Sequence, residues 1–175
     1  QMQSNGIGYQ FNINKEPFNN ENNSYFCFDP AISLAFKPLK DFLENSDLIK
    51  VINNYLGFHS LIYFSSTWCN PTTSETHYVH RLHRDYDDFK FLVMTIYWND
   101  INKLNGPLEY VKKSHRNKDI TKPSTLLIGS AGTVTITDNF GLHRGNQVKE
   151  KVRYITTIRF GQYFNSASVS NGFLS

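Results

Sequence analysis

A histidine and an aspartate stand two residues apart, directly before a long apolar stretch. Positions 80–100 read HRLHRDYDDFKFLVMTIYWND. If this segment is extended, side chains two apart point to the same side, so that His83 and Asp85 can bind one metal ion together. We predict a third ligand at His143, which follows the β-type run GTVTIT. The three residues would form one metal site.

An arginine further along the chain extends this site. Two histidines and one carboxylate leave the other positions of the ion open, an arrangement that suits non-haem Fe(II) chemistry. Arg153 opens the β-type run VRYITTIRF after His143. Pointing inward, its guanidinium would offer a fixed fork for a dicarboxylate. Thr157 lies on the same strand face and could help to bind the dicarboxylate. Arg159 is the alternative partner for the dicarboxylate.

Two simpler interpretations of the histidines compete with the metal site. His83 and Asp85 could be a surface pair at the end of a strand. Alternatively, His77, His80 and His83 could bind zinc from one face of a helix, at positions i, i+3 and i+6. The β-type residues around them argue against a helix. His83, Asp85, His143 and Arg153 follow one another in this order along the chain, which favours the metal site over both alternatives.

The composition limits the possible classes of protein. The chain has 175 residues and a net charge of +3, which suits one domain over 1–175 and gives no dense basic stripe for a nucleic acid. No apolar run has the length of a membrane span, and the amino-terminal residues do not read as a signal peptide. Cys27 and Cys69 are expected to be free thiols, so we expect a cytoplasmic protein.

The first third of the chain carries helical patterns. FDPAISLAFKPLKDFLEN has apolar residues at helical spacing, and Pro38 interrupts it, which predicts a short helix and a second one starting near Pro38. SDLIKVINNYLG predicts another helix, capped by Ser46 and ended by Gly57. Its apolar stripe comprises Leu48, Val51, Ile52, Tyr55 and Leu56.

After Gly57 the pattern changes to short β-type runs separated by turn residues. These runs are SLIYFSSTW, HYVHRLH, FKFLVMTIYW, PLEYVKK, TLLIG, GTVTITD and VRYITTIRFG. They predict a mainly β protein, a double-stranded β-helix (a jelly-roll or cupin-like barrel) over 58–165, with flanking helices in 1–57.

The apolar run before Trp98 divides into two faces. Alternation predicts that Leu92, Met94, Ile96 and Trp98 lie in the core. The opposite face carries Thr95 and Tyr97, which we expect to point into the barrel near a cosubstrate. Ordinary barrel filling is the alternative role for these two residues.

The combined order of these segments resembles the phytanoyl-CoA dioxygenase family of Fe(II)/2-oxoglutarate oxygenases. The resemblance covers roughly residues 60–160. It rests on His-x-Asp, then IYWNDINKLNGPLEYVKKSHR, then GSAGTVTITDNFGLHRGN, then Arg153. The similar pieces within these segments are NGPL, the Ser-His pair at 114–115 and the HRGN run from His143.

The resemblance implies a fold, cofactors and an activity. His83, Asp85 and His143 would bind Fe(II), and Arg153 would hold the distal carboxylate of 2-oxoglutarate. The implied reaction uses O₂ to convert 2-oxoglutarate to succinate and CO₂ while a C–H bond of a small molecule is oxidised. Related halogenases lack the metal-binding carboxylate, so Asp85 favours hydroxylation.

The chain departs from the family pattern at two places. Lys112 and Lys113 stand where many members have Pro-Gly before Ser-His. Gly145 stands two residues after the distal histidine, where many members have Ser or Thr near the cosubstrate. The second departure concerns the binding of 2-oxoglutarate and leaves the metal ligands unchanged.

Several basic residues near the site are candidates for substrate binding. They are His80, Arg81, Lys112 and Lys113. Lys112 and Lys113 begin a basic loop that reaches Lys118, which could attract an anionic substrate but more commonly would be a solvated surface.

Two other functions remain as alternatives to a hydroxylase. The chain could be a non-catalytic cupin-like module that binds metal, or a cysteine-type dioxygenase that uses three histidines. Asp85 argues against the latter. We expect a monomer or homodimer with a small-molecule substrate, without nucleic-acid or membrane partners.

Overall fold

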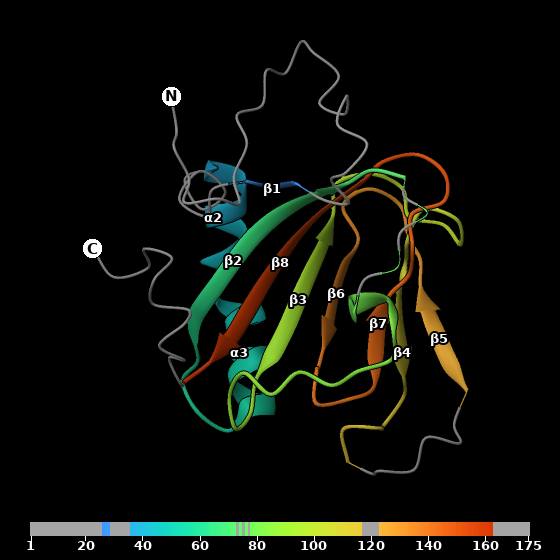
Figure 1. Cartoon of the computed structure of the whole chain (residues 1–175). Coiled ribbons are helices and arrows are strands. Elements are labelled where there is room, and N and C mark those ends of the chain that lie inside the picture. The colour runs from blue at the N-terminus through green and yellow to red at the C-terminus, as the bar shows by residue number, and fades with distance from the viewer. Residues whose placement is uncertain are drawn as a thin grey trace.

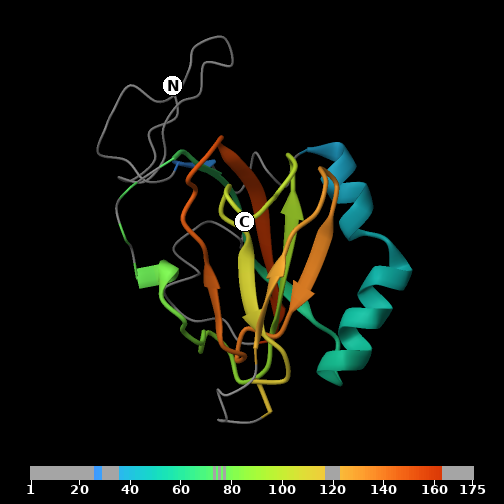
Figure 2. The same ribbon diagram turned by 90° about the vertical axis from the view of Figure 1, so that its right-hand side faces the viewer.

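The structure, a computed structural model, describes residues 26–28, 36–72, 74, 76, 78–116 and 123–162. These residues form two antiparallel sheets that face each other, with two helices on one side (Figures 1 and 2). The larger sheet has the order β1 (Phe26–Phe28), β2 (Leu61–Asn70), β8 (Arg153–Gly161), β3 (Leu92–Tyr97), β6 (Val134–Thr137). The smaller sheet has the order β5 (Ser124–Leu127), β4 (Leu108–Val111), β7 (His143–Gly145). The prediction of a mainly β protein with flanking helices is confirmed.

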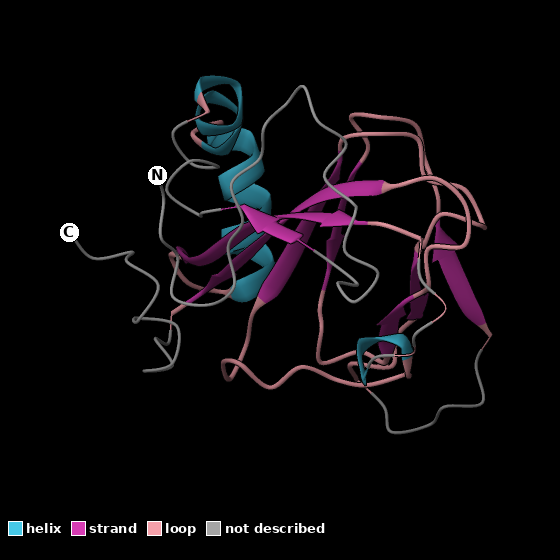
Figure 3. Ribbon diagram, turned by 45° about the horizontal axis from the view of Figure 1, so that its top comes forward, coloured by secondary structure: helices cyan, strands magenta, loops and turns pink. Residues whose placement is uncertain are grey.

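The helices α2 (Lys37–Leu43) and α3 (Ser46–Leu56) pack on the outer face of the larger sheet (Figure 3). Pro38 lies in the first turn of α2, as expected, because a proline there loses no helical hydrogen bond. The shorter helix predicted before it falls mainly on residues 29–35, outside the described residues. No helix in the described ranges is both long and apolar enough to cross a membrane.

The predicted cap and stripe of α3 are only partly correct. Asn45, not Ser46, caps the helix, because its side-chain oxygen accepts from the backbone N–H groups of Asp47 and Leu48 at 3.0 and 3.1 Å. Gly57 ends the helix with a φ of 83°, as predicted. Ile52 and Leu56 are buried, but Val51 is 63% exposed, since only one narrow side of α3 meets the sheet.

The apolar face of β3 forms the core beneath the helices. Leu92, Met94 and Ile96 pack with Leu39, Leu43, Ile52, Leu56, Ile158 and Phe160. The prediction is wrong for Trp98, which lies beyond the end of β3 and is 41% exposed. Its indole N–H donates to the Thr156 hydroxyl at 2.7 Å, so a polar partner holds the ring at the rim.

The opposite face of the larger sheet carries polar side chains beside a smaller apolar cluster that includes Phe91 and Val93. Thr95 on β3 is paired with Thr157 on β8 and Thr135 on β6, so the three threonines share one face. The alternation along β8 also places Arg153 and Arg159 on that face. Threonine and arginine side chains therefore lie on the face opposite the helices.

The described part of the segment HYVHRLH, residues 78–83, is not a strand, contrary to the prediction. It forms a short 3₁₀ helix, η1 (Tyr78–His80), and then reaches the smaller sheet through a single bridge between His83 and His143. The alternation of polar and apolar residues was too short to distinguish a strand from one helical turn. The bridge brings the two histidines together.

Lys113 offers a test of backbone strain in the turn after β4. Its φ is 65°, a left-handed conformation that costs free energy for a residue with a Cβ. Replacing the exposed Lys113 with glycine should therefore raise the free energy of unfolding by roughly 0.5–1 kcal/mol. Lys112→Gly, which removes the same charge next door without a positive φ, should lower it. Urea unfolding measures both variants, and equal effects would contradict the strain.

Candidate metal centre

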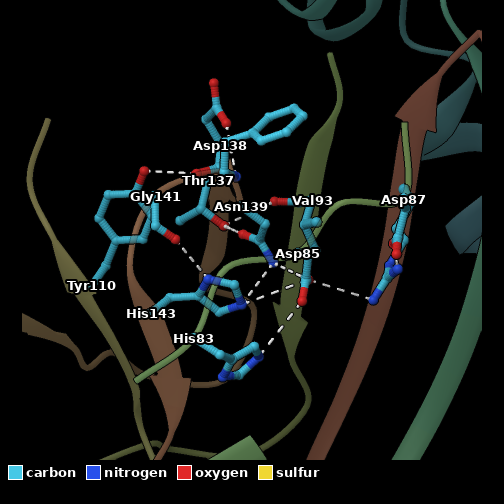
Figure 4. A network of polar contacts seen from close by, with 12 residues as sticks. His83, Asp85, Asp87, Val93, Tyr110, Thr137, Asp138, Asn139, Gly141 and His143 are labelled. Carbon is cyan, nitrogen blue, oxygen red and sulfur yellow. Dashed lines mark hydrogen bonds and ion pairs between the residues drawn. The ribbon is translucent and has the colours of Figure 1, made fainter. Parts of the chain in front are cut away.

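The side chains of His83, Asp85 and His143 converge on one point (Figure 4). One potential ligand atom from each lies within 4.8 Å of the others. Nε2 of His83 lies 3.5 Å from Asp85 Oδ1, and Nε2 of His143 lies 3.6 Å from Asp85 Oδ2. The structure therefore brings together the three residues predicted to bind a metal.

Backbone hydrogen bonds fix the positions of these residues. The N–H and C=O groups of His83 and His143 pair with each other at 2.9 and 3.0 Å. The Asp85 N–H donates to the carbonyl of Asn139 at 2.9 Å. We expected His83 and Asp85 on one regular strand, but they lie in an irregular segment that is tied to β7 and to the loop before it.

The tautomers of both histidines follow from their partners. Nδ1 of His83 lies 2.8 Å from the carbonyl oxygen of Arg81, and Nδ1 of His143 lies 2.9 Å from that of Gly141. A carbonyl only accepts, so each Nδ1 must carry the proton. Nε2 is therefore the atom of each ring that could bind a metal, and both Nε2 atoms face Asp85. Nε2 of His143 also lies 3.2 Å from the Asn139 amide nitrogen.

Asp85 is held in its charged form. Burial raises the pKa of its carboxyl, but the His143 imidazole, the Asn139 amide and the Arg159 guanidinium outweigh burial and lower it to about 2. Asp85 is therefore an anion at neutral pH. An anionic carboxylate is the form that binds a metal ion.

The chemistry and spacing of these donors fit a divalent transition metal. Two donors bound about 2.1 Å from one ion lie about 3.0 to 3.4 Å apart at octahedral or tetrahedral angles. The spacings of 3.5 and 3.6 Å reach different oxygens of Asp85, and one ligand atom from each residue lies within 4.8 Å of the others, so the side chains would move closer together on binding one ion. Two imidazoles and one carboxylate suit iron, with positions left for further ligands.

Arg153 is a half-buried cation without a carboxylate partner in the described part of the chain. Its Nε donates to Asn70 Oδ1 at 3.1 Å, and its Nη1 donates to the carbonyl of Gly106. Burial lowers the pKa of the guanidinium to about 10. Neutral oxygens only partly compensate a desolvated charge, so this site fits an added anion.

The other residues predicted near a cosubstrate lie on the same face of the larger sheet as Arg153. Burial raises the pKa of Tyr97, and the charge of Arg153 opposes that rise. The Tyr97 hydroxyl donates to the Leu127 carbonyl at 2.7 Å, so its proton is already committed. Thr95 is buried and stands opposite Thr157 in the sheet. Their roles toward a cosubstrate remain predictions.

Among the candidates for substrate binding, Arg81 contacts this network through its backbone carbonyl, which faces Nδ1 of His83. Arg81, Lys112 and Lys113 are exposed, while His80 is half-buried in η1. Nothing in their geometry links them to a substrate, and their role remains a prediction. His77 and Lys118 lie outside the described residues, and His83 faces Asp85 instead of a helical zinc trio.

The sequence did not predict two of the contacts that Asp85 makes, those with Asn139 and Arg159. The Asn139 amide lies 3.0 Å from Asp85 Oδ2, and Arg159 Nη2 lies 3.6 Å from the same oxygen. Arg159 also pairs with Asp87. Arg159 was predictable as a neighbour of the site, because it shares the strand face of Arg153; Asn139 carried no such signal.

Comparisons with solved structures support the fold. No family model and none of the curated proteins searched matches the sequence. The non-heme alpha ketoglutarate dependent epimerase SnoN from nogalamycin biosynthesis has a TM-score of 0.63, with 14% identity over 86% of this chain and 65% of its own. HygX from Streptomyces hygroscopicus, solved with nickel and 2-oxoglutarate bound, has a TM-score of 0.59, with 13% identity over 81% of this chain and 71% of its own.

AviO1 from Streptomyces viridochromogenes Tue57 has a TM-score of 0.58, with 17% identity over 78% of this chain. The chain spans about two thirds of the length of AviO1 and of SnoN, 66% and 65%. At these identities the comparisons establish the fold: this chain folds like structures that include a non-heme alpha ketoglutarate dependent enzyme and a nickel and 2-oxoglutarate complex.

Proposed function

We propose that this chain is an Fe(II)- and 2-oxoglutarate-dependent oxygenase that hydroxylates a C–H bond of a small molecule. The observation that carries the proposal is the pairing of two sites in one fold. His83, Asp85 and His143 present fixed metal-binding atoms. Arg153 presents a guanidinium without a carboxylate partner among the described residues.

The strand order supports a double-stranded β-helix as the finer description of the fold. Its larger sheet would comprise β2, β8, β3 and β6. In its smaller sheet, the His83 segment would take the place of the missing outer strand beside β7, since it bridges to His143 there. The metal would then lie between the two sheets of the barrel, at the end of β7.

The metal and each of these residues would have a separate role in the reaction. Bound Fe(II) would supply the redox chemistry that couples O₂ to oxidation of both 2-oxoglutarate and the substrate. Asp85 and the two histidines would hold the ion on one side. Arg153 would neutralise the distal carboxylate of 2-oxoglutarate through paired N–H donors. One oxygen atom of O₂ would enter succinate and the other would enter the hydroxylated product.

The solved neighbours agree with this chemistry. SnoN has been solved in complex with Fe3+, alpha ketoglutarate and nogalamycin RO, and HygX with hygromycin B. By analogy, we propose a small organic molecule as the substrate. SnoN is an epimerase and SnoK a carbocyclase, so this fold carries several reactions. The proposal of hydroxylation rests on Asp85 in this chain.

The decisive assay is succinate release from 2-oxoglutarate under air. The purified chain with Fe(II) should form succinate slowly without substrate, and a chelator should stop the reaction. A screen of small molecules should then find compounds that accelerate turnover and gain one oxygen in mass spectrometry. A chain that binds metal but forms no succinate with any compound would be the non-catalytic module.

Gly145 offers a gain-of-function prediction. A Cβ at Gly145 would lie 3.8 Å from Arg153 Nη1, an ordinary contact distance, so a small side chain fits there. Gly145→Ser would place a hydroxyl next to the guanidinium and should lower the KM for 2-oxoglutarate by several-fold, since one hydrogen bond contributes about 1 kcal/mol. Gly145→Ala is the control and should leave KM unchanged. A serine variant that behaves like alanine would contradict the placement of the cosubstrate.

A further inference from the structure

Asn139 binds Asp85 at two points. Its backbone carbonyl accepts the Asp85 N–H at 2.9 Å, and its side-chain amide lies 3.0 Å from Asp85 Oδ2 (Figure 4). Asn139 is only 6% exposed, so water does not compete freely for these contacts. Both the backbone and the carboxylate of Asp85 are therefore held by one residue.

The orientation of the Asn139 amide follows from its partners. A charged carboxylate cannot donate, so the group facing Asp85 must be the NH₂ group. On the other side, the Thr137 hydroxyl donates to Asn139 Oδ1 at 2.8 Å. Thr137 is itself buried on β6. The Asp85 carboxylate thus sets the rotation of the amide, and the Thr137 hydroxyl supports it by donating to Oδ1. The same amide nitrogen also lies 3.2 Å from Nε2 of His143.

The two oxygens of Asp85 are consequently not equivalent. Oδ2 receives the Asn139 amide, lies 3.6 Å from Arg159 Nη2 and also lies 3.6 Å from Nε2 of His143. Oδ1 faces Nε2 of His83 at 3.5 Å, which carries a lone pair because Nδ1 holds the proton. Within the described part of the chain, no hydrogen-bond donor is directed at Oδ1. Oδ1 is therefore the oxygen available to a metal.

We infer that Asn139 is a positioning residue that reserves Oδ1 of Asp85 for the metal and prevents the carboxylate from binding through both oxygens. This inference rests on the proposed metal site. Binding through both oxygens would occupy an additional coordination position, which 2-oxoglutarate or O₂ needs. Residues that orient a ligand in this way commonly change metal affinity 10- to 100-fold, about the effect expected here.

Cobalt(II) titration of the purified metal-free chain tests the inference. Visible absorption reports both the affinity and the coordination of the ion. Asn139→Leu, which keeps the bulk of the side chain without its donors, should weaken cobalt binding by about 10- to 100-fold and alter the spectrum. Unchanged affinity and spectrum in Asn139→Leu would overturn the inference.

Thr137 provides a pair of variants that separates orientation from packing. Thr137→Val keeps the shape but removes the hydroxyl, whereas Thr137→Ser keeps the hydroxyl and leaves a gap. Orientation of the amide requires that valine weakens cobalt binding more than serine. If Thr137 had only a packing role, serine would weaken cobalt binding more than valine, because valine fills the space better and suits a strand. That result would overturn the inference.

The wild-type chain separates this inference from the proposed function. If the wild type binds no cobalt, the proposed metal site fails and the inference fails with it. If the wild type binds cobalt and the Asn139 variant binds it equally, only the role of Asn139 is wrong. Melting temperatures of the metal-free variants show whether each is folded, and the Thr137 pair tests the inference even if Asn139→Leu does not fold.

Discussion

Replacing Asp85 with alanine should lower the affinity for the metal by more than about 100-fold and abolish succinate formation. Loss of a residue that only supports a metal ligand lowers the affinity by up to about 100-fold, and loss of the ligand itself should cost more. Asp85 supplies the only carboxylate of the three-residue cluster, and its pKa of about 2 keeps it charged. Without it, two neutral imidazoles must hold a dication with no compensating charge. The measurements are calorimetric titration with Fe(II) under anaerobic conditions and succinate formation under air.

The control for this variant removes a carboxylate elsewhere. Glu44 follows α2 and pairs with Lys40 at 3.8 Å on the exposed surface. Glu44→Ala removes the same charge and should leave metal affinity and turnover unchanged, because surface ion pairs contribute little. Full turnover in Asp85→Ala would mean that another group completes the metal site.

Replacing Arg153 with alanine should raise the KM for 2-oxoglutarate by about 30-fold or more, with metal affinity unchanged. Removing one partner of a partly buried, hydrogen-bonded charge pair commonly costs about 2 kcal/mol or more. Arg153→Lys should lie between wild type and alanine, because a single ammonium restores the charge without the paired donors. Steady-state succinate formation against 2-oxoglutarate concentration gives the KM of each variant.

Two other arginines make this prediction specific. Arg81→Ala removes an exposed guanidinium, and the KM for 2-oxoglutarate should stay at its wild-type value. Arg159 lies on the same strand face as Arg153 but already pairs with Asp85 and Asp87. If Arg153→Ala and Arg153→Lys both keep the wild-type KM, Arg159 becomes the candidate that holds the acid.

The convergence of His83, Asp85 and His143 could be predicted because their chemistry and order are distinctive. His-x-Asp before a strand, a later histidine and an arginine form a combination that few other functions need. The structure brings His83, Asp85 and His143 together, although the two residues of the first pair are not on a regular strand. A single backbone bridge to His143 replaces the strand that we expected, and the local alternation could not distinguish the two.

Other features depend on contacts that the sequence does not display. Asn139 reaches Asp85 only because the loop before β7 folds back, so its role is set by a turn and not by spacing. The alternation of β3 assigns Trp98 to the core face, but Trp98 lies beyond the end of the strand and is exposed there. Asn45 caps α3 because its side chain reaches two N–H groups, which Ser46, already inside the helix, cannot do.

Lys113 shows the opposite case, in which structure explains a departure seen in the sequence. The resembling family commonly has Pro-Gly where this chain has Lys112 and Lys113. The φ of 65° at Lys113 is a conformation that glycine adopts without strain. The turn before Ser114 therefore has a backbone shape suited to glycine, although lysine occupies the position.

The most direct measurement of the central claim is an anaerobic calorimetric titration of the metal-free chain with Fe(II), followed by 2-oxoglutarate. The account predicts that one Fe(II) binds per chain, and that one 2-oxoglutarate then binds with an affinity that depends on the metal. Loss of Fe(II) binding in both His83→Ala and His143→Ala would locate the ion at the predicted site. Fe(II) binding that is absent in the wild type, or that survives both substitutions unchanged, would contradict it.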